Sequence, residues 1–308
     1  MEFKNLTGDS RAVRQLEICV SEPENILLTG VMGTAKTDIL RLAAKKLLCR
    51  GDKTEACTCA SCVRMLDYHP DFKMVLPEGG VIRKEQVDSI VENAREMPQM
   101  ADVKVFLISG GDKMNASAAN ALLKVLEDSG RNIFFITSDG EVLNTISSRC
   151  RVIKLKAVLP EIDLGAEREM INMACDGRIE YVQDFKKDGF FKKLYAFKEL
   201  LYTMKSKVEI LEFFNGLKEK DKEEFYASST AYERDAVLRL MSRVYYMTLL
   251  DMRGIMLPEI NGSEAIARLY AAEDIVRISD AISNAYKCHM AQSYTKNDWF
   301  MLMTELTR

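Results

Sequence analysis

The stretch Asn25–Leu40, NILLTGVMGTAKTDIL, decides the fold of this chain. Its apolar start is typical of a buried strand and its end has the apolar spacing of a helix, which predicts a strand, a loop and a helix in succession. A loop of the form G-x-x-x-x-G-K-[ST] wraps backbone N–H groups and a helix N-terminus around polyphosphate, with the lysine on the outer phosphates and the hydroxyl on magnesium. The candidate phosphate-binding residues are Gly30, Gly33, Lys36 and Thr37.

This loop departs from the pattern at Ala35, which stands in place of the second glycine. A methyl group there hinders close approach of the backbone to phosphate and disfavours a positive φ. In a P-loop ATPase, a later strand ends in an acidic pair that anchors magnesium and orients the attacking water. Ser109 and Gly110 occupy those places after the predicted strand 103–109. The sequence therefore predicts a site that holds ATP or ADP weakly or not at all and lacks its metal anchor and its base.

Length and composition set the broad class. A chain of 308 residues is expected to form two or three domains. A net charge of -3 argues against binding nucleic acid by bulk charge. No apolar run approaches the roughly 18 residues that span a bilayer, and the N-terminus has no signal-peptide core. We expect a cytoplasmic protein.

Four of the eight cysteines lie within fourteen residues: Cys49, Cys57, Cys59 and Cys62. In a reducing compartment such a cluster favours metal binding over disulfides, and four thiolates suit tetrahedral zinc. The single residue between Cys57 and Cys59 is fewer than the usual two. A cysteine-rich loop without metal, and a site of three cysteines with His69, are the alternatives.

Strand and helix patterns alternate from residue 26 to 155 and then give way to helical patterns alone. Such alternation predicts a mostly parallel sheet with helices on both faces, followed by all-α material. Predicted strands are 26–28, 72–76, 103–109, 132–138 and 152–155, and the helices among them are 9–20, 82–96 and 117–126. Later helices are predicted at 163–175, 178–187, 190–203, 207–219, 221–228, 230–253, 263–270, 272–291 and 296–307.

Several motifs occur in a specific order between residues 1 and 155. They are GVMGTAKT, a cysteine group ending in CASC, HPDF, IRKEQVDSIVENA, VKVFLIS running into GGDKMNASAANALLKVLED, and TISSRC. Together they resemble the bacterial DNA polymerase III clamp-loader AAA+ family. The resemblance implies an AAA+ P-loop domain over 1–157 with a zinc module at about 49–62, a helical lid domain over 158–205 and a helical collar domain for oligomerisation over 206–308.

The resemblance also implies a role for Ser148-Arg149-Cys150, whose arginine acts in this family on ATP bound by the neighbouring subunit. With Ala35, Ser109 and Gly110 in its own site, the chain is similar to a subunit that does not hydrolyse ATP. The implied partners are motor subunits of the gamma and tau type, the clamp-opening delta subunit and, through the complex, the sliding clamp and primed DNA, with no membrane.

Other interpretations of the same residues stay open. Arg149 is alternatively an ordinary surface or helix-capping arginine. The chain is alternatively an ATP-hydrolysing motor subunit whose acidic residue comes from elsewhere, such as Asp112. A third alternative is a zinc-dependent nucleic-acid-binding module with a vestigial nucleotide fold, which the acidic pI of 5.7 disfavours.

Overall fold

The computed structural model divides the chain into two compact units. The α/β unit comprises residues 1–163 and 177–180, and the helical unit comprises residues 164–176 and 181–308. The residues that the structure describes are 2–54, 57–64, 68–127, 130–161, 175–182, 190–216, 231–255, 262–290 and 295–308.

A five-stranded parallel sheet forms the centre of the α/β unit, with the strands in the order β2-β3-β4-β1-β5. Each of the five predicted strands is present, with ends that differ from the prediction by at most one residue. The strands are β1 (Ile26–Thr29), β2 (Phe72–Val75), β3 (Lys104–Ser109), β4 (Asn132–Ser138) and β5 (Arg151–Lys154).

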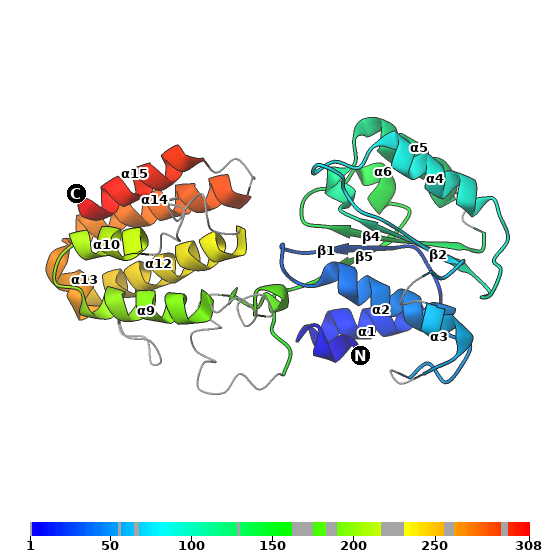
Figure 1. Ribbon diagram of the computed structural model, residues 1–308, viewed down its shortest axis with the longest axis horizontal. Coiled ribbons are helices and arrows are strands. Elements are labelled where there is room, and N and C mark those ends of the chain that lie inside the picture. Colours follow the sequence, from blue (N-terminus) through cyan, green and yellow to red (C-terminus); the bar gives the residue numbers. More distant parts are fainter. Residues whose placement is uncertain are drawn as a thin grey trace. The chain divides into compact units, whose positions relative to one another are not determined.

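Helices cover both faces of this sheet, as predicted (Figure 1). The first face carries α1 (Ser10–Ser21) and α2 (Lys36–Leu48), and the second carries α4 (Lys84–Ala94), α5 (Ala116–Glu127) and the short α6 (Asn144–Ser147). A 3-10 turn (Phe3–Asn5) precedes α1, the short α3 (Ala60–Arg64) follows α2, and a second 3-10 turn (Gly111–Lys113) follows β3.

The strands are apolar on both sides because both sides are buried. Ile133 and Phe135 of β4 enter the core beneath α1 and α2, whereas Phe134 and Ile136 enter the core beneath α4 and α5. This alternation follows from the two-residue period of a strand, and a sheet covered on both faces explains the near-continuous apolar runs.

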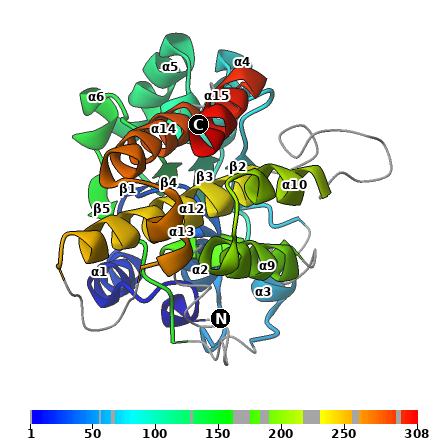
Figure 2. The ribbon, with the colours of Figure 1, turned by 90° about the vertical axis from the view of Figure 1, so that its left-hand side faces the viewer.

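The helical unit contains the later helices predicted from periodicity. In both views α14 and α15 lie side by side (Figures 1 and 2), and Trp299 is buried edge-on against Phe214, with ring centroids 4.9 Å apart. The described helices are α9 (Phe190–Thr203), α10 (Val208–Gly216), α12 (Ala231–Met252), α13 (Glu264–Leu269), α14 (Ala272–Met290) and α15 (Lys296–Thr307). The predicted helix 221–228 and all of 163–175 except Cys175 lie outside the described residues. Of the predicted helix 178–187 the structure describes 178–182, in which 179–182 form a helical turn.

Two further expectations concern the whole chain. A division of the helical part into 158–205 and 206–308 stays a prediction. Among the described helices, none combines the length and apolar character needed to cross a membrane.

A buried carboxylate, Asp71, ties β2 to the loop before β3. Its oxygens accept hydrogen bonds from the N–H groups of Gln99, Met100 and Ala101, each at 2.7 Å. Burial raises the pKa of Asp71, but these three hydrogen bonds together lower it by a larger amount. The pKa of Asp71 therefore lies below the usual value of 3.8. The ionised carboxylate therefore stabilises the fold.

We expect Asp71→Asn to lower the free energy of unfolding by about 3 kcal/mol, because an amide replaces a charged acceptor of three buried donors. Since the folded pKa of Asp71 is depressed, its contribution is complete above pH 3.8 and is lost as the pH falls through the folded value. Urea unfolding at several pH values measures this. Asp102→Asn, at a side chain that is 95% exposed, is the control, and equal losses for the two variants would contradict the prediction.

Candidate functional site

The candidate nucleotide site lies at the carboxyl edge of the sheet. Thr29, the last residue of β1, pairs in register with Ser138 of β4, and Ser109, the last residue of β3, pairs with Thr137. Parallel strands bring their carboxyl ends to one edge, where ligands bind in open α/β sheets. The loop that follows β1 and the start of α2 therefore stand beside the ends of β3 and β4.

Two glycines of this loop are required by its backbone. A Cβ on Gly30 would lie 2.7 Å from the carbonyl oxygen of Leu155, and Gly33 has a φ of 87°. Ala35 is buried and also left-handed, at φ 55° and ψ 31°. A side chain in that region costs roughly 1–2 kcal/mol, so the loop keeps the conformation that the missing glycine would favour, at the expense of strain.

Lys36 is buried and turned towards its own loop. Its Nζ donates to the carbonyl oxygen of Val31 at 2.6 Å and to the hydroxyl of Thr34 at 3.1 Å. The same ammonium forms an ion pair with Asp139, immediately after β4, at 2.8 Å. The positive charge that the motif directs at phosphate is thus neutralised within the chain.

The hydroxyl of Ser109 stands where a P-loop ATPase has the first residue of its acidic pair, and Gly110 stands in place of the second. The Thr37 and Ser109 hydroxyl oxygens lie 2.8 Å apart, and Thr137 accepts the N–H of Gly110 at 3.0 Å and donates to Ser109 at 3.5 Å. Among the described residues, the end of β3 therefore presents a hydrogen-bonded hydroxyl cluster to Thr37 where a P-loop ATPase has a magnesium-binding carboxylate.

Asp112 is engaged on the side of β4. One of its oxygens accepts the hydroxyl of Ser138 at 3.0 Å and the N–H of Asp139 at 3.3 Å, and its other oxygen forms an ion pair with Lys113 at 3.4 Å. These contacts give the carboxylate a role in holding the turn after β4.

Arg149 lies at the opposite, amino-end edge of the sheet. Asn25, directly before β1, donates its side-chain amide to the carbonyl oxygen of Arg149 at 3.4 Å and accepts the N–H of Phe134. Arg151, the first residue of β5, donates its N–H to the carbonyl oxygen of Asn25 at 2.7 Å. The four residues of β1 separate this edge from the loop by about 13 Å.

The guanidinium of Arg149 is a third exposed and held by local contacts. It pairs with Glu127 at the end of α5 and donates to the carbonyl oxygen of Thr145 at 2.8 Å. Ser148 is exposed, and its hydroxyl oxygen accepts from Arg149 at 3.4 Å. The side chain of Ile146 is buried and holds the segment 144–149 against the core. Ser148 and Arg149 lie on the outer side of this segment.

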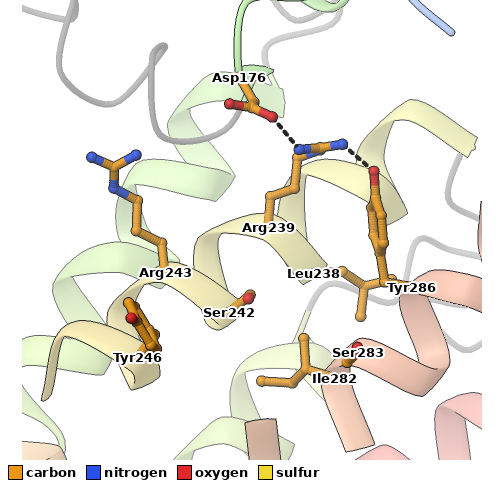
Figure 3. A pocket seen from close by; sticks show the side chains of 9 residues that line it. All are labelled: Asp176, Leu238, Arg239, Ser242, Arg243, Tyr246, Ile282, Ser283 and Tyr286. Carbon is orange, nitrogen blue, oxygen red and sulfur yellow. Dashed lines mark hydrogen bonds and ion pairs between the residues drawn. The ribbon is translucent and has the colours of Figure 1, made fainter. Parts of the chain in front are cut away.

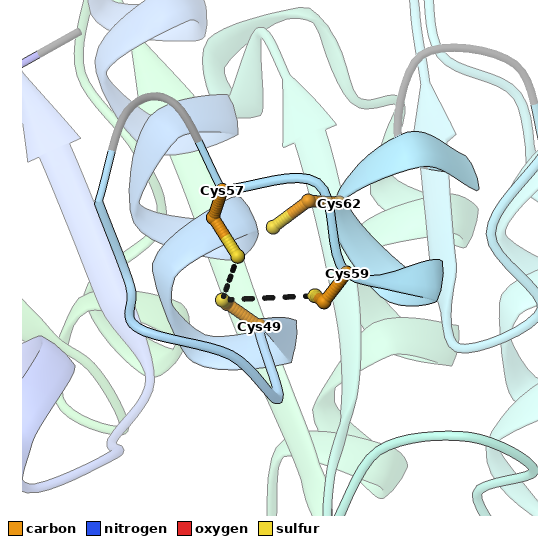
Figure 4. Close-up of side chains that lie close together, drawn as sticks. All are labelled: Cys49, Cys57, Cys59 and Cys62. Carbon is orange, nitrogen blue, oxygen red and sulfur yellow. Dashed lines mark hydrogen bonds between the residues drawn. The ribbon is translucent and has the colours of Figure 1, made fainter.

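The four clustered cysteines come together despite their irregular spacing (Figure 4). Their sulfur atoms all lie within 4.8 Å of one another, with Cys49 3.6 Å from Cys57 and 3.9 Å from Cys59. Thiolates around tetrahedral zinc at 2.3 Å would stand about 3.8 Å apart. A hydrogen bond from the Cys62 amide lowers the pKa of Cys59 to about 6. The geometry and donor chemistry fit zinc.

His69 is occupied elsewhere. Its Nδ1 accepts the N–H of Asp71 at 3.1 Å, so its Nε2 carries the proton and donates to the hydroxyl of Ser61 at 2.7 Å. Ser61 in turn donates to the carbonyl oxygen of Leu48. Both ring nitrogens are used in joining the cysteine module to the sheet, which favours four cysteines over three cysteines with His69.

A cavity of about 330 Å³ in the helical unit lies between α12, α14 and Asp176 (Figure 3). Arg239 points across it and forms ion pairs with Asp176 at 2.7 Å and Asp235 at 2.9 Å, and it also bonds the hydroxyl of Tyr286. The two carboxylates neutralise the charge of the Arg239 guanidinium. Because its partners come from different elements, Arg239 links the walls of the cavity.

Three acidic residues near the two edges of the sheet were not predicted. Asp139 pairs with Lys36, Glu127 pairs with Arg149, and the N–H of Glu180 donates to the carbonyl oxygen of Gly33. A polar residue directly after a buried strand is a signal that would have found Asp139. Glu180 and Glu127 reach their sites through the tertiary fold, and no local pattern marks them.

Comparison with known proteins gives matches in the same region. A family model described as "DNA polymerase III, delta subunit" matches residues 20–158. The DNA polymerase III subunit delta' of Bacillus subtilis (strain 168) is 33% identical over 140 residues, 44% of this chain and 43% of that protein. Subunit delta' of Haemophilus influenzae is 28% identical over 209 residues, 62% and 64% of the two chains. A DNA polymerase III subunit gamma of Buchnera aphidicola subsp. Schizaphis graminum is 34% identical over 145 residues, 45% and 39%.

The parallel sheet and its loop give the α/β unit the fold of a P-loop domain, with Ala35 in place of the second glycine of the motif. Over residues 20–158 the chain resembles, in particular, the delta-prime subunit of the bacterial DNA polymerase III clamp loader, and the resemblance predicted from the motif order is confirmed. The chain spans less than two thirds of the length of these relatives.

We expect Ala35→Gly to change the free energy of unfolding by less than about 0.5 kcal/mol, because relief of left-handed strain offsets the extra chain entropy of glycine. Ala121→Gly, inside α5, is the matched control and should cost about 1 kcal/mol. Urea denaturation of both variants measures the difference. Equal losses would show that Ala35 is not strained.

Proposed function

We propose that this chain is a non-hydrolysing subunit of the DNA polymerase III clamp loader and that it presents Arg149 to ATP bound by an adjacent subunit. The observation that carries the proposal is the place of Arg149, at the sheet edge opposite the chain's own loop and about 13 Å from it across β1. A guanidinium there is out of reach of its own nucleotide site but accessible to a neighbour.

Electrostatics support this role. An arginine supplied to a transferred phosphoryl group offsets developing negative charge and is worth about 10³ to 10⁵ in rate. The pair with Glu127 is half-exposed, and exposed ion pairs are worth about 0–1 kcal/mol. The guanidinium of Arg149 can therefore leave Glu127 and pair with a phosphate at little cost in free energy. Until it does so, the carboxylate of Glu127 keeps the guanidinium at the surface.

The chain's own nucleotide site supports the non-hydrolysing half of the proposal. Ser109 and Thr37 share a hydrogen bond where a carboxylate and magnesium would be needed, and Lys36 is neutralised by Asp139. Asp112, the alternative acid, is held by Ser138. These contacts favour a structural loop over the motor-subunit alternative.

The proposed partners are the motor subunits of the gamma and tau type and the clamp-opening delta subunit, with the sliding clamp and primed DNA reached through the complex. Among the similar proteins are subunits named gamma and tau as well as delta'. The helical unit, with its exposed Phe300 and Met301 on α15, is proposed to contribute to the assembly.

In a clamp loader reconstituted from this chain with motor and delta subunits, we expect Arg149→Ala to lower hydrolysis at the adjacent ATP site by about 10³-fold or more. Clamp- and DNA-stimulated hydrolysis, measured with the other motor sites inactivated, isolates that site. Arg149→Lys should restore only part of the rate, since lysine lacks the planar fork of the guanidinium.

Arg151→Ala is the matched control, because Arg151 lies two residues away and pairs with Glu24 on the surface. It should leave the rate unchanged. An unchanged rate with Arg149→Ala in an assembled complex would contradict the assignment of Arg149, and ATP hydrolysis by the purified chain alone would contradict the non-hydrolysing role.

The cysteine module is proposed to hold a structural zinc ion on Cys49, Cys57, Cys59 and Cys62. The sulfur separations support this, as does Gly51, whose N–H donates to Cys49 at 3.3 Å. Zinc would join the end of α2 to α3 in a loop that has little core of its own.

We expect one zinc per chain by elemental analysis, and a lower melting temperature once a chelator removes it. Gly51→Ala should weaken zinc binding by about 10- to 100-fold, because its Cβ would lie 2.5 Å from the sulfur of Cys57. Thr58→Ala, at an exposed position between two ligands, is the control. Metal-free protein with an unchanged melting temperature would contradict the assignment.

A further inference from the structure

The helical turn 179–182 brings an acidic residue, Glu180, against the phosphate-binding loop. The N–H of Glu180 donates to the carbonyl oxygen of Gly33 at 3.2 Å. Gly177 fixes this approach, since it has a φ of 79° and a Cβ there would lie 2.0 Å from the carbonyl oxygen of Ala157. Segment 177–180 is accordingly part of the α/β unit.

Glu180 is half-buried, and its carboxylate lies near two groups that a phosphate would use, the Ala35 amide and Lys36. Burial raises its pKa, while attraction to Lys36 and a hydrogen bond from the Ala35 amide lower it by a smaller amount. The negative charges of Asp38 and Asp139 also act on it. A carboxyl group of the chain itself therefore stands beside the loop amide and the lysine of the motif.

We infer that Glu180 is a specificity-determining residue that excludes nucleotide, with its carboxylate held where the loop would receive the phosphates of ADP or ATP. Asp139 completes the arrangement by pairing with Lys36 at 2.8 Å. Together the two carboxylates satisfy the loop as a phosphate would. This inference deepens the proposed function, because it gives a physical cause for the absence of nucleotide chemistry in this subunit.

Two features make Glu180 more effective than Asp139 as a barrier. The Asp139 side chain is 41% exposed, so it can turn outward into water when a phosphate arrives. The backbone of Glu180 is held by its hydrogen bond to Gly33, and its half-buried side chain is screened less by solvent. A nucleotide phosphate entering the loop would therefore meet the Glu180 carboxylate at close range, where like charges repel.

The test is ADP binding by the full-length, zinc-loaded chain, measured by isothermal titration calorimetry. Glu180→Gln keeps the shape and an acceptor oxygen but removes the charge, so it should bind ADP at least about tenfold more tightly than wild type, which equals 1.4 kcal/mol. Adding Lys36→Ala to this variant should abolish the gain. Glu141→Gln, at an exposed carboxylate after β4, removes the same charge elsewhere and should leave binding unchanged.

Equal ADP affinity for wild type and Glu180→Gln would overturn the inference, whether both bind or neither does. Glu180→Ala, compared in the same way, replaces Glu180→Gln if circular dichroism shows that the latter is unfolded. The result is separable from the proposed function. Wild-type chain that binds ADP as tightly as the variant, yet supports hydrolysis through Arg149 in the complex, would overturn only the role of Glu180.

Discussion

The parallel direction of all five strands is the constraint on which both candidate sites depend. Because the strands share one direction, the loop after β1 and the ends of β3 and β4 meet at one edge, while Asn25 and Arg149 meet at the other. The length of β1 then separates the loop from the edge at Asn25 and Arg149 by about 13 Å. The backbone of Arg149 and the chain's own loop therefore lie at opposite edges of the sheet.

The second determinant is charge balance around a buried lysine. Lys36 cannot remain buried without partners, and in this chain the partners are the carbonyl oxygen of Val31 and the carboxylate of Asp139. Ser109, which stands where a P-loop ATPase has an acidic residue, fits the same charge balance around Lys36. Its hydroxyl forms a hydrogen bond with Thr37 without adding negative charge. The loop and Asp139 thus supply the partners of Lys36 from within the chain.

Local periodicity was sufficient to predict the strands and most described helices, because buried parallel strands and amphipathic helices carry strong patterns. The phosphate-loop motif marked Gly30 and Lys36, and close spacing marked the cysteine cluster. Local periodicity could not reveal that Glu127 pairs with Arg149, since those partners are 22 residues apart and meet only through α5 and α6. Nor could spacing exclude His69 as a ligand, because its tautomer depends on Ser61 and Asp71 in the folded chain.

These features together explain why a degenerate loop is still well formed. Ala35 keeps the left-handed geometry, and Lys36 is engaged by the loop's own atoms, so the loop contributes packing and hydrogen bonds whether or not phosphate binds. Removing it would expose α2 and the carboxyl ends of three strands. Arg149, by contrast, rests on an ion pair that is cheap to exchange. Under the proposed function, stability comes from the packed P-loop fold, whereas Arg149 would act through a guanidinium whose local ion pair is weak.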